Sequence, residues 1–438
     1  MRPGILSAAV GALATAACGG TGGGTALDWQ PAMTLAGGAA PALAARADGR
    51  ITAAWTGAPG GGADGRLFVR PNLGDSAAVE LRDPAGALTI YGETPPKLTW
   101  GPDGTLYAAY LLTRAEPGHQ WPTNMLRVAT SADGGRTWGA PVTVQSDTVH
   151  NGSTDDHALL AAPDGTVYLA WLAQERDTSH SWLSASRDGG RTWSAPRVMD
   201  AGPACPCCRT ALATGADGRL YAAWRRIFGR DSTEVRDIVV AASPDHGATW
   251  SAPVRVHEDD WHVHYCPDAG PTLRAGADGV LHVAWWTGKP GGAGVRYAQS
   301  RDGGRSFSAP VELGVAPASR AAHAQLALAD ARRVVVAWDD GTLVVPRIVV
   351  RRSADGGHTF AAADTLSAPG ASAGYPVVAV ARDTVVVAWQ ERTTAEASAD
   401  SARHHDAMAR AAGKAPDASQ WINRVSSWSV VMRRAALR

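Results

Sequence analysis

Two short segments of this 438-residue chain concentrate side chains that could bind a metal or exchange electrons. They hold three cysteines in the first segment, and two histidines and a cysteine in the second: Cys205, Cys207, Cys208, His262, His264 and Cys266. In an extended backbone alternate side chains point to the same side, so the two histidines would face one way together with the last cysteine. Thiolate and imidazole groups suit Cu(I) or Zn(II). The two segments therefore form a candidate metal site.

The same cysteines also fit a disulfide hypothesis. The chain has five cysteines, and four remain, an even number, when Cys18 is set aside. A disulfide between the adjacent Cys207 and Cys208 would close a strained ring, so we expect one of these two to pair with Cys266. Cys205 would pair with the other only if the turn at Pro206 permits. Such a bond closes a loop of about 60 residues and contributes roughly 4 kcal/mol in the chain-entropy model. Disulfides, a metal site and free thiols are three alternatives that the sequence leaves open.

Carboxylates, a tyrosine and arginines near these segments could bind an anionic ligand and carry out acid–base or nucleophilic chemistry. The candidate catalytic residues are Asp155, Asp156, Tyr265 and Asp268. The candidate substrate-binding residues are Arg209, Arg225, Arg236, Arg320 and His323. Arginine presents a planar fork of donors that matches a carboxylate, so a group of arginines predicts an anion pocket. Carboxylates and tyrosine serve in acid–base and nucleophilic catalysis.

A repeated eight-residue motif shows which elements must position these residues. The clearest copy is SRDGGRTW at Ser186–Trp193, and the five copies place aspartates at regular positions: Asp133, Asp188, Asp245, Asp302 and Asp355. The steps of 55, 57, 57 and 53 residues indicate a repeated supersecondary unit. Asp-Gly-Gly favours a tight turn, because glycine adopts positive φ and the carboxylate accepts hydrogen bonds from turn amides. We therefore assign these aspartates to the scaffold and not to catalysis.

A second repeat predicts an all-β fold. Seven apolar strands end in an aromatic residue: Trp55, Tyr110, Trp171, Trp224, Trp285, Trp338 and Trp389. Most of them follow an Asp-Gly turn, which is typical of a hairpin. Each unit then has four strands, which in the fifth unit are 271–275, 280–286, 295–299 and 309–313. Radial packing of such units predicts a seven-bladed β-propeller, with six blades as the alternative, and segment 30–35 would supply the fourth strand of the last blade.

In such a propeller the crossings between blades and the loops between second and third strands share one rim. The five turns of the repeated motif lie at the other end of their blades. All of the candidate residues above fall in the crossings or in these loops. We therefore expect them to surround one mouth of the propeller axis.

The repeated motif resembles the Asp-box, or BNR repeat, of the sialidase superfamily. The resemblance implies that the boxes lie away from the active site, and that an active sialidase needs an arginine triad, a Tyr–Glu nucleophile pair and an Asp acid/base. The family also carries a Phe/Tyr-Arg-Ile-Pro motif. The nearest text here, Phe68-Val69-Arg70-Pro71, has an extra residue and no isoleucine. No catalytic motif is matched, and sialidases have six blades, whereas other Asp-box proteins have seven.

The N-terminus resembles a bacterial lipoprotein signal. Residues 1–17 contain Arg2, then an apolar run, then small residues, which is typical of a signal peptide. Cys18 would carry the lipid, and residues 19–28 would form a flexible tether. Residues 29–438 form one propeller domain, with an insertion at 391–427 that includes a surface helix at 394–412. The predicted location is extracytoplasmic, with a lipid anchor in the membrane or, alternatively, with plain secretion.

The sequence thus predicts a sialidase-like propeller that binds acidic glycans and, if it is an enzyme, hydrolyses them as an exo-sialidase does, without a cofactor. One alternative is a non-enzymatic binding or scaffold lipoprotein that recognises an envelope component. Another is a metal-binding propeller with Cu or Zn at the cysteines and histidines. Lys+Arg and Asp+Glu are both 41, so no net charge favours a nucleic-acid partner. We expect a monomer.

Overall fold

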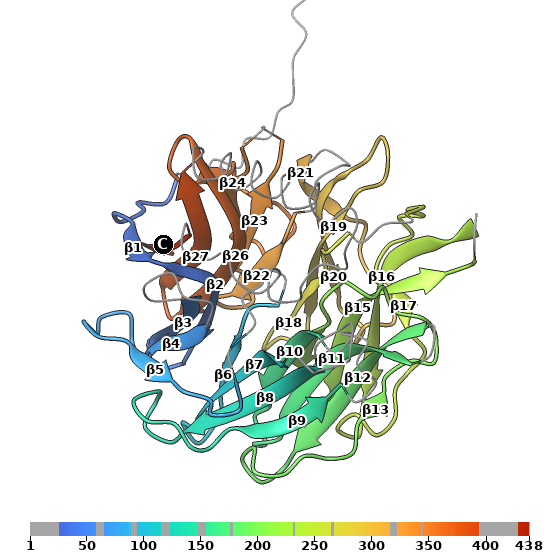
Figure 1. The fold of residues 1–438 in the computed structure, drawn as a ribbon. Coiled ribbons are helices and arrows are strands. Elements are labelled where there is room, and N and C mark those ends of the chain that lie inside the picture. Colours follow the sequence, from blue (N-terminus) through green and yellow to red (C-terminus); the bar gives the residue numbers. More distant parts are fainter. Residues whose placement is uncertain are drawn as a thin grey trace, which may run out of the picture.

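The chain folds into a ring of β-sheets (Figure 1). The computed structural model describes residues 26–57, 65–86, 88, 94–114, 123–147, 155–175, 178–230, 233–263, 267–315, 322–342, 345–393 and 428–437. Within these ranges 28 strands form seven four-stranded antiparallel sheets, which confirms the seven-bladed propeller and not the six-bladed alternative. Among the described residues we find no helical segment with the length and apolarity that a bilayer crossing needs. The predicted helix at 394–412 lies outside the described residues.

Each blade runs from an inner strand near the axis to an outer fourth strand. Blades one to three contain β2 (Gly38–Ala45), β3 (Ile51–Gly57), β4 (Arg66–Arg70), β5 (Val79–Leu81), β6 (Lys97–Trp100), β7 (Leu106–Arg114), β8 (Thr123–Ser131), β9 (Val142–Ser146), β10 (Asp155–Ala161), β11 (Val167–Glu175), β12 (Thr178–Ser186) and β13 (Arg197–Val198). Blades four to six contain β14 (Ala211–Thr214), β15 (Leu220–Phe228), β16 (Val235–Ser243), β17 (Val254–Arg255), β18 (Thr272–Ala275), β19 (Leu281–Thr287), β20 (Gly294–Ser300), β21 (Val311–Val315), β22 (Gln325–Leu328), β23 (Val334–Asp340), β24 (Arg347–Ser353) and β25 (Asp364–Thr365). Blade seven contains β26 (Ala371–Ala381), β27 (Thr384–Thr393), β28 (Ser429–Ala436) and β1 (Met33–Ala36).

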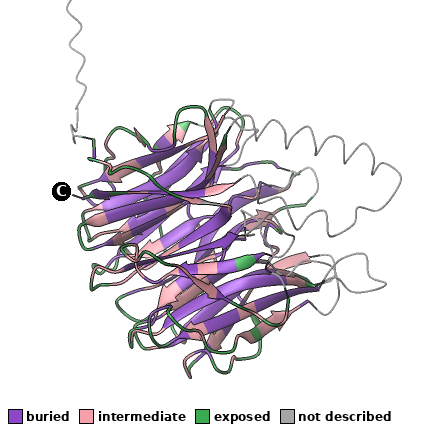
Figure 2. Ribbon diagram, turned by 60° about the vertical axis from the view of Figure 1, so that its left-hand side comes forward, coloured by how far each residue is buried: buried purple, intermediate pink, exposed green. Residues whose placement is uncertain are grey.

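The second strands form the core because their sequence is apolar at successive positions. In β19 every residue is buried, and Figure 2 shows burial running through the middle of the blades. A strand that is buried on both faces reads as a continuous apolar run. The alanine before each terminal aromatic, such as Ala223 before Trp224, is fully buried and lets neighbouring sheets approach closely.

The ring closes with a strand from the N-terminal end of the described chain. β1 pairs antiparallel with β28, from Met33 opposite Met432 to Ala36 opposite Ser429. Figure 1 shows the blue and red ends of the chain side by side in this blade. The predicted closure is confirmed, with the strand at 33–36 instead of 30–35. Closure covers the edge that the last blade would otherwise expose.

The Asp-boxes are hydrogen-bonded turns at the end of the blades opposite the crossings. In the box at 186–193, Asp188 accepts hydrogen bonds from the backbone amide of Thr192 (2.9 Å) and from its hydroxyl (2.6 Å). The hydroxyl of Ser186 donates to Asp188 (2.8 Å) and accepts from the amide of Gly190 (2.9 Å). The predicted scaffold role therefore agrees with the geometry.

Loss of the box serine should destabilise the fold. Ser186 is buried, and Ser186→Ala leaves the buried amide of Gly190 without its acceptor. We expect the free energy of unfolding to fall by about 1–3 kcal/mol in urea denaturation. Any activity per folded molecule should be unchanged, and a fully stable Ser186→Ala chain would contradict this account of the box.

The boxes also predict acid sensitivity. Hydrogen bonds from Thr249 and Ser306 lower the pKa values of Asp245 and Asp302 from 3.8 to about 2. Because these folded-state pKa values are depressed, the stabilisation is fully present above pH 3.8 and is lost as the pH falls through about 2. The difference in melting temperature between the wild type and Asp302→Asn should therefore narrow over this window. A difference that stays constant with pH would show that the carboxylate charge does not contribute.

Candidate functional site at the mouth of the propeller

Five side chains lie at the starts of the inner strands, at the rim opposite the Asp-boxes. We call them the axial mouth: Lys97, Asp156, Arg209, His323 and Tyr375. In each blade one inner-strand residue pairs with the alanine that precedes the aromatic residue of the second strand; in blade four it is Ala211, opposite Ala223. The last four residues of the axial mouth each lie two positions before that inner-strand residue, as Arg209 does before Ala211. Lys97 occupies the position of Ala211 in its own blade, opposite Ala109. Equal register positions put the last four residues at one level around the axis, and Lys97 lies two residues further along its own inner strand.

The backbone bends at this position. Asp156 and Tyr375 have positive φ values of 49° and 54°, and the pairing register of both strands shifts there. Non-glycine residues rarely adopt such angles, and when they do the surrounding structure must hold them. The bend turns the chain from the crossing into the inner strand.

One side of the mouth is basic. Burial, together with the positive charge of Arg209, lowers the pKa of the half-buried Lys97 well below its usual value, against the opposing effect of Asp156. Arg209 and Asp156 are themselves buried. Burial and the charge of Lys97 also lower the pKa of His157 to about 3, so this imidazole is neutral and its Nε2 donates to the carbonyl of Ala109 at 3.3 Å. The cation on this side is therefore Arg209, because burial and the charge of Arg209 disfavour the charged form of Lys97. A buried cation attracts an anionic ligand.

The other side holds an imidazole and a phenol. The Nδ1 of His323 donates to the buried carboxylate of Asp339 at 2.6 Å, and the backbone amides of His323 and Tyr375 donate to the same carboxylate. The rings of His323 and Tyr375 lie 4.4 Å apart, centroid to centroid. Burial alone would raise the pKa of Asp339, but the charge and hydrogen bonds of His323 hold it below its usual value. This arrangement fixes the His323 ring with Nε2 as the atom for proton exchange.

Two of the predicted substrate-binding arginines bind the protein itself. The guanidinium of the fully buried Arg225 donates to the carbonyls of Ala269 (3.0 Å), Trp286 (2.7 Å) and Arg236 (3.2 Å). Arg236 pairs with Glu234 at 2.8 Å and donates to the Sγ of Cys205 at 3.4 Å. The structure thus brings Arg225 and Arg236 to the cysteines, and Arg209 to the mouth.

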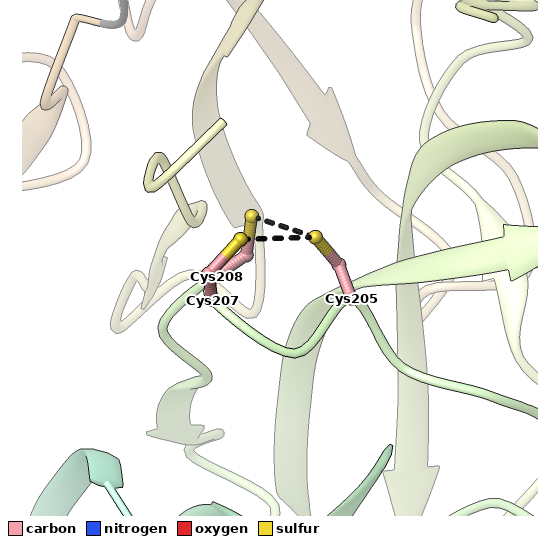
Figure 3. A group of neighbouring side chains, drawn as sticks. All are labelled: Cys205, Cys207 and Cys208. Atoms are coloured by element: carbon pink, nitrogen blue, oxygen red, sulfur yellow. Dashed lines mark hydrogen bonds between the residues drawn. The ribbon is translucent and has the colours of Figure 1, made fainter. Parts of the chain in front are cut away.

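Three cysteines converge before the inner strand of blade four, and we call Cys205, Cys207 and Cys208 the cysteine trio (Figure 3). The Sγ of Cys205 lies 3.2 Å from that of Cys208 and 3.7 Å from that of Cys207. Burial raises the pKa of Cys205, but hydrogen bonds from the other two thiols and the charges of Arg225 and Arg236 outweigh it and hold the pKa well below its usual value. Burial raises the pKa of Cys208, and the hydrogen bond with Cys205 raises that of Cys207.

The remaining predicted site residues are placed in part. His262 is exposed on its segment, and Asp268 is half-buried with a φ of 49°. The backbone of Asp155 begins β10. The other five lie outside the described residues: Cys18, His264, Tyr265, Cys266 and Arg320. A disulfide or metal bond to Cys266 therefore stays a prediction.

Sequence reasoning assigned no role to Lys97, Asp339 or Tyr375. A signal was available in the residue that follows the aromatic of each second strand. Four of these residues are polar yet buried: Thr56, Arg225, Asp339 and Gln390. A polar residue in an otherwise apolar strand indicates a buried group with a specific partner.

A groove opens on the same rim between blades three and four. Its volume is about 940 Å³, and His180, Pro206, Arg226, Arg230 and Arg236 are among its lining residues. Arg226 pairs with Asp200 at 2.6 Å, as Arg236 does with Glu234. This rim groove lies beside the cysteine trio, because Pro206, in the turn that holds the three cysteines, is one of its lining residues.

The role of Arg225 can be tested directly. Arg225→Met removes the donor to three carbonyls, and each buried carbonyl left without a donor costs about 1–3 kcal/mol. We expect a marked drop in the free energy of unfolding, whereas the exposed Arg230→Met should change it by about 0.5 kcal/mol or less. If Arg225→Met is as stable as the wild type but loses an anionic ligand, the original substrate-binding assignment holds instead.

Comparisons with known proteins agree with this architecture. The family described as BNR repeat-like domain matches residues 88–282. No curated protein matches the sequence. A solved protein of unknown function from Dyadobacter fermentans DSM 18053 is 18% identical, with a TM-score of 0.52 over 93% of this chain and 98% of that chain. A polysaccharide lyase, an ulvan lyase, is 12% identical, with a TM-score of 0.54 over 81% and 91% of the two chains.

A second ulvan lyase structure, bound to -[GlcA(1-4)Rha3S]-, matches with 12% identity and a TM-score of 0.54, over 82% of this chain and 93% of that chain. At these identities the likeness concerns the fold. The chain is a seven-bladed β-propeller with BNR-type repeats, and the predicted resemblance to the Asp-box propellers is confirmed for the repeat and the fold.

Proposed function

We propose that the axial mouth binds an acidic polysaccharide and cleaves it by β-elimination beside a uronic acid carboxylate. One observation carries the proposal. His323, held by the buried Asp339, lies against Tyr375 where the inner strands of blades six and seven begin, and Arg209 and Lys97 lie where those of blades four and two begin. A cation, a base and an acid around one opening are the groups that this reaction needs.

Arg209 and Lys97 would bind the substrate carboxylate. Burial and the neighbouring Arg209 disfavour the charged form of Lys97 in the free protein. A carboxylate at this place would favour it again, since an opposite charge nearby raises the pKa of an amine. Neutralising the carboxylate also lowers the barrier to removing the proton on the adjacent carbon, because negative charge develops there in the transition state.

His323 and Tyr375 would move the two protons. The Nε2 of His323 takes the proton from the carbon that bears the carboxylate, and the electrons of that C–H bond form a double bond to the neighbouring ring carbon. The glycosidic C–O bond on that second carbon breaks, and the Tyr375 hydroxyl donates a proton to the leaving oxygen. Acid–base groups placed in this way contribute about 10²–10⁴-fold each.

The neighbours in fold support the substrate class. One of the ulvan lyase structures holds -[GlcA(1-4)Rha3S]-, which contains a uronic acid. A polysaccharide substrate also agrees with the extracytoplasmic location proposed from residues 1–17 and Cys18. The membrane would then be reached only through the lipid on Cys18, and an envelope glycan would be a natural partner.

Sialidase-type hydrolysis, the activity that the resemblance implied, is the competing proposal. It needs three converging arginines, and of the four candidates Arg209 is the one at the mouth among the residues described. Asp156 would be the acid in such a reaction. We place β-elimination first because His323 and Tyr375 supply its acid and base directly.

An activity screen distinguishes these outcomes. The full chain is incubated with uronic acid polysaccharides and with sialosides. Elimination is followed by the ultraviolet absorbance of the new C=C bond, and hydrolysis is followed by the release of reducing ends. We expect unsaturated product, and Tyr375→Phe and His323→Gln should each lower kcat by about 10²–10⁴-fold. Arg209→Gln should mainly raise KM.

The matched control is Tyr221→Phe, which also removes one tyrosine hydroxyl. Tyr221 lies in β15 at the Asp-box end of its blade, so this variant should keep full activity. Sialoside hydrolysis without unsaturated product would replace the lyase proposal by the sialidase one. Turnover that survives both Tyr375→Phe and His323→Gln would contradict the assignment of the mouth.

A further inference from the structure

The cysteine trio is a pocket of three sulfur atoms that the proposed glycan chemistry does not use. All three Sγ atoms lie within 4.8 Å of one another. Cys205 and Cys208 are buried, whereas Cys207 is partly exposed. Figure 3 shows the three side chains pointing toward one another from one short turn. Two of the thiols are therefore enclosed by the protein, and the third is accessible to solvent.

The backbone holds this turn in place before any ligand binds. The amide of Cys205 donates to the carbonyl of Arg225 at 2.8 Å, and the amide of Cys208 donates to the carbonyl of Cys205 at 3.4 Å. The amide of Ala204 donates across to the carbonyl of Ser179 in blade three at 2.8 Å. Anchoring to two blades means that little conformational entropy is lost when a ligand binds all three sulfurs.

Two buried guanidinium groups offset part of the charge of such a site. Arg236 donates to the Sγ of Cys205, and the charge of Arg225 acts on both Cys205 and Cys208. Three thiolates around a monovalent cation carry a net charge of −2; the two arginines supply +2, and Glu234, which pairs with Arg236, takes up one of these charges. A buried ionic group is tolerated when it is paired in this way.

We propose that the cysteine trio binds one Cu(I) ion in a three-coordinate thiolate site. Thiolates favour soft metal ions, Cu(I) and Zn(II) among them. A metal–sulfur distance of about 2.3 Å in trigonal geometry puts the sulfurs about 4 Å apart. The separations of 3.2 and 3.7 Å are near this value, so small side-chain rotations complete the site. Structural zinc sites use four ligands, and the described cluster has three.

Competition with a chromogenic Cu(I) chelator tests the proposal. The full chain is reduced, kept anaerobic and titrated into the Cu(I)–bicinchoninate complex, and the loss of chelator absorbance gives the copper transferred. We expect one Cu(I) per chain, with three sulfur ligands in X-ray absorption at the copper edge. Cys205→Ser and Cys208→Ser should lose the bound equivalent, and Cys207→Ser, on the exposed side, should lower its affinity at least tenfold while the melting temperature stays unchanged.

Cys266→Ser is the matched comparison, and it should retain the bound equivalent. Loss of copper in Cys266→Ser would overturn the three-thiolate site in favour of a wider one. No transfer of Cu(I) to the reduced chain, or retention of Zn(II) but not Cu(I), would also overturn the proposal. So would a disulfide within the trio that forms in the isolated chain in place of copper binding.

Discussion

The buried backbone at the bent starts of the inner strands needs hydrogen-bond partners, and the rest of the rim depends on how the blades supply them. Unpaired backbone groups in a dry interior are costly. The polar residue after each strand aromatic meets this need in several blades. The Oε1 of Gln390 accepts from the amide of Ala40 at 3.1 Å, and the hydroxyl of Thr56 donates to the carbonyl of Ala39 at 3.1 Å. The mouth is therefore built on side chains and not only on the strand ladder.

Asp339 and Arg225 show how this requirement also links blades. Asp339, in blade six, accepts from the amide of Tyr375 in blade seven as well as from His323 in its own blade. Arg225, in blade four, donates to the carbonyls of Ala269 and Trp286 in blade five. Asp339 and Arg225 thus hold neighbouring blades in register. The groups proposed for chemistry then occupy positions that this framework fixes, which is the preorganisation that catalysis needs.

Most of the fold could be predicted from the sequence because its signals are local and repeated. The Asp-box and Asp-Gly turns mark strand ends directly, so the predicted strand 271–275 is found as Thr272–Ala275 and 280–286 as Leu281–Thr287. The N-terminal closing strand was also predictable, since the last blade lacked one strand. These features depend on turn chemistry and on alternating or continuous apolar patterns, which a single sequence displays.

The site could be predicted only as a rim. Sequence cannot tell whether an arginine meets a substrate or the carbonyls of its own chain, and Arg225 meets carbonyls. It cannot show that Lys97, an ordinary inner-strand residue, shares a basic region with Arg209 across two blades. Nor does it reveal that Asp339 orients His323, because the two residues are 16 positions apart in the chain and the turn between β22 and β23 brings them together. These facts depend on long-range contacts that the repeat pattern does not encode.

The central claim, that an acidic saccharide binds at the axial mouth, is tested most directly by a crystal structure of the chain with a uronic acid oligosaccharide. The account predicts electron density at the axis, with the carboxylate within hydrogen-bond reach of Arg209 and Lys97 and a sugar ring beside His323 and Tyr375. Density in the rim groove at Arg226 and Arg230 instead, with an empty mouth, would contradict it.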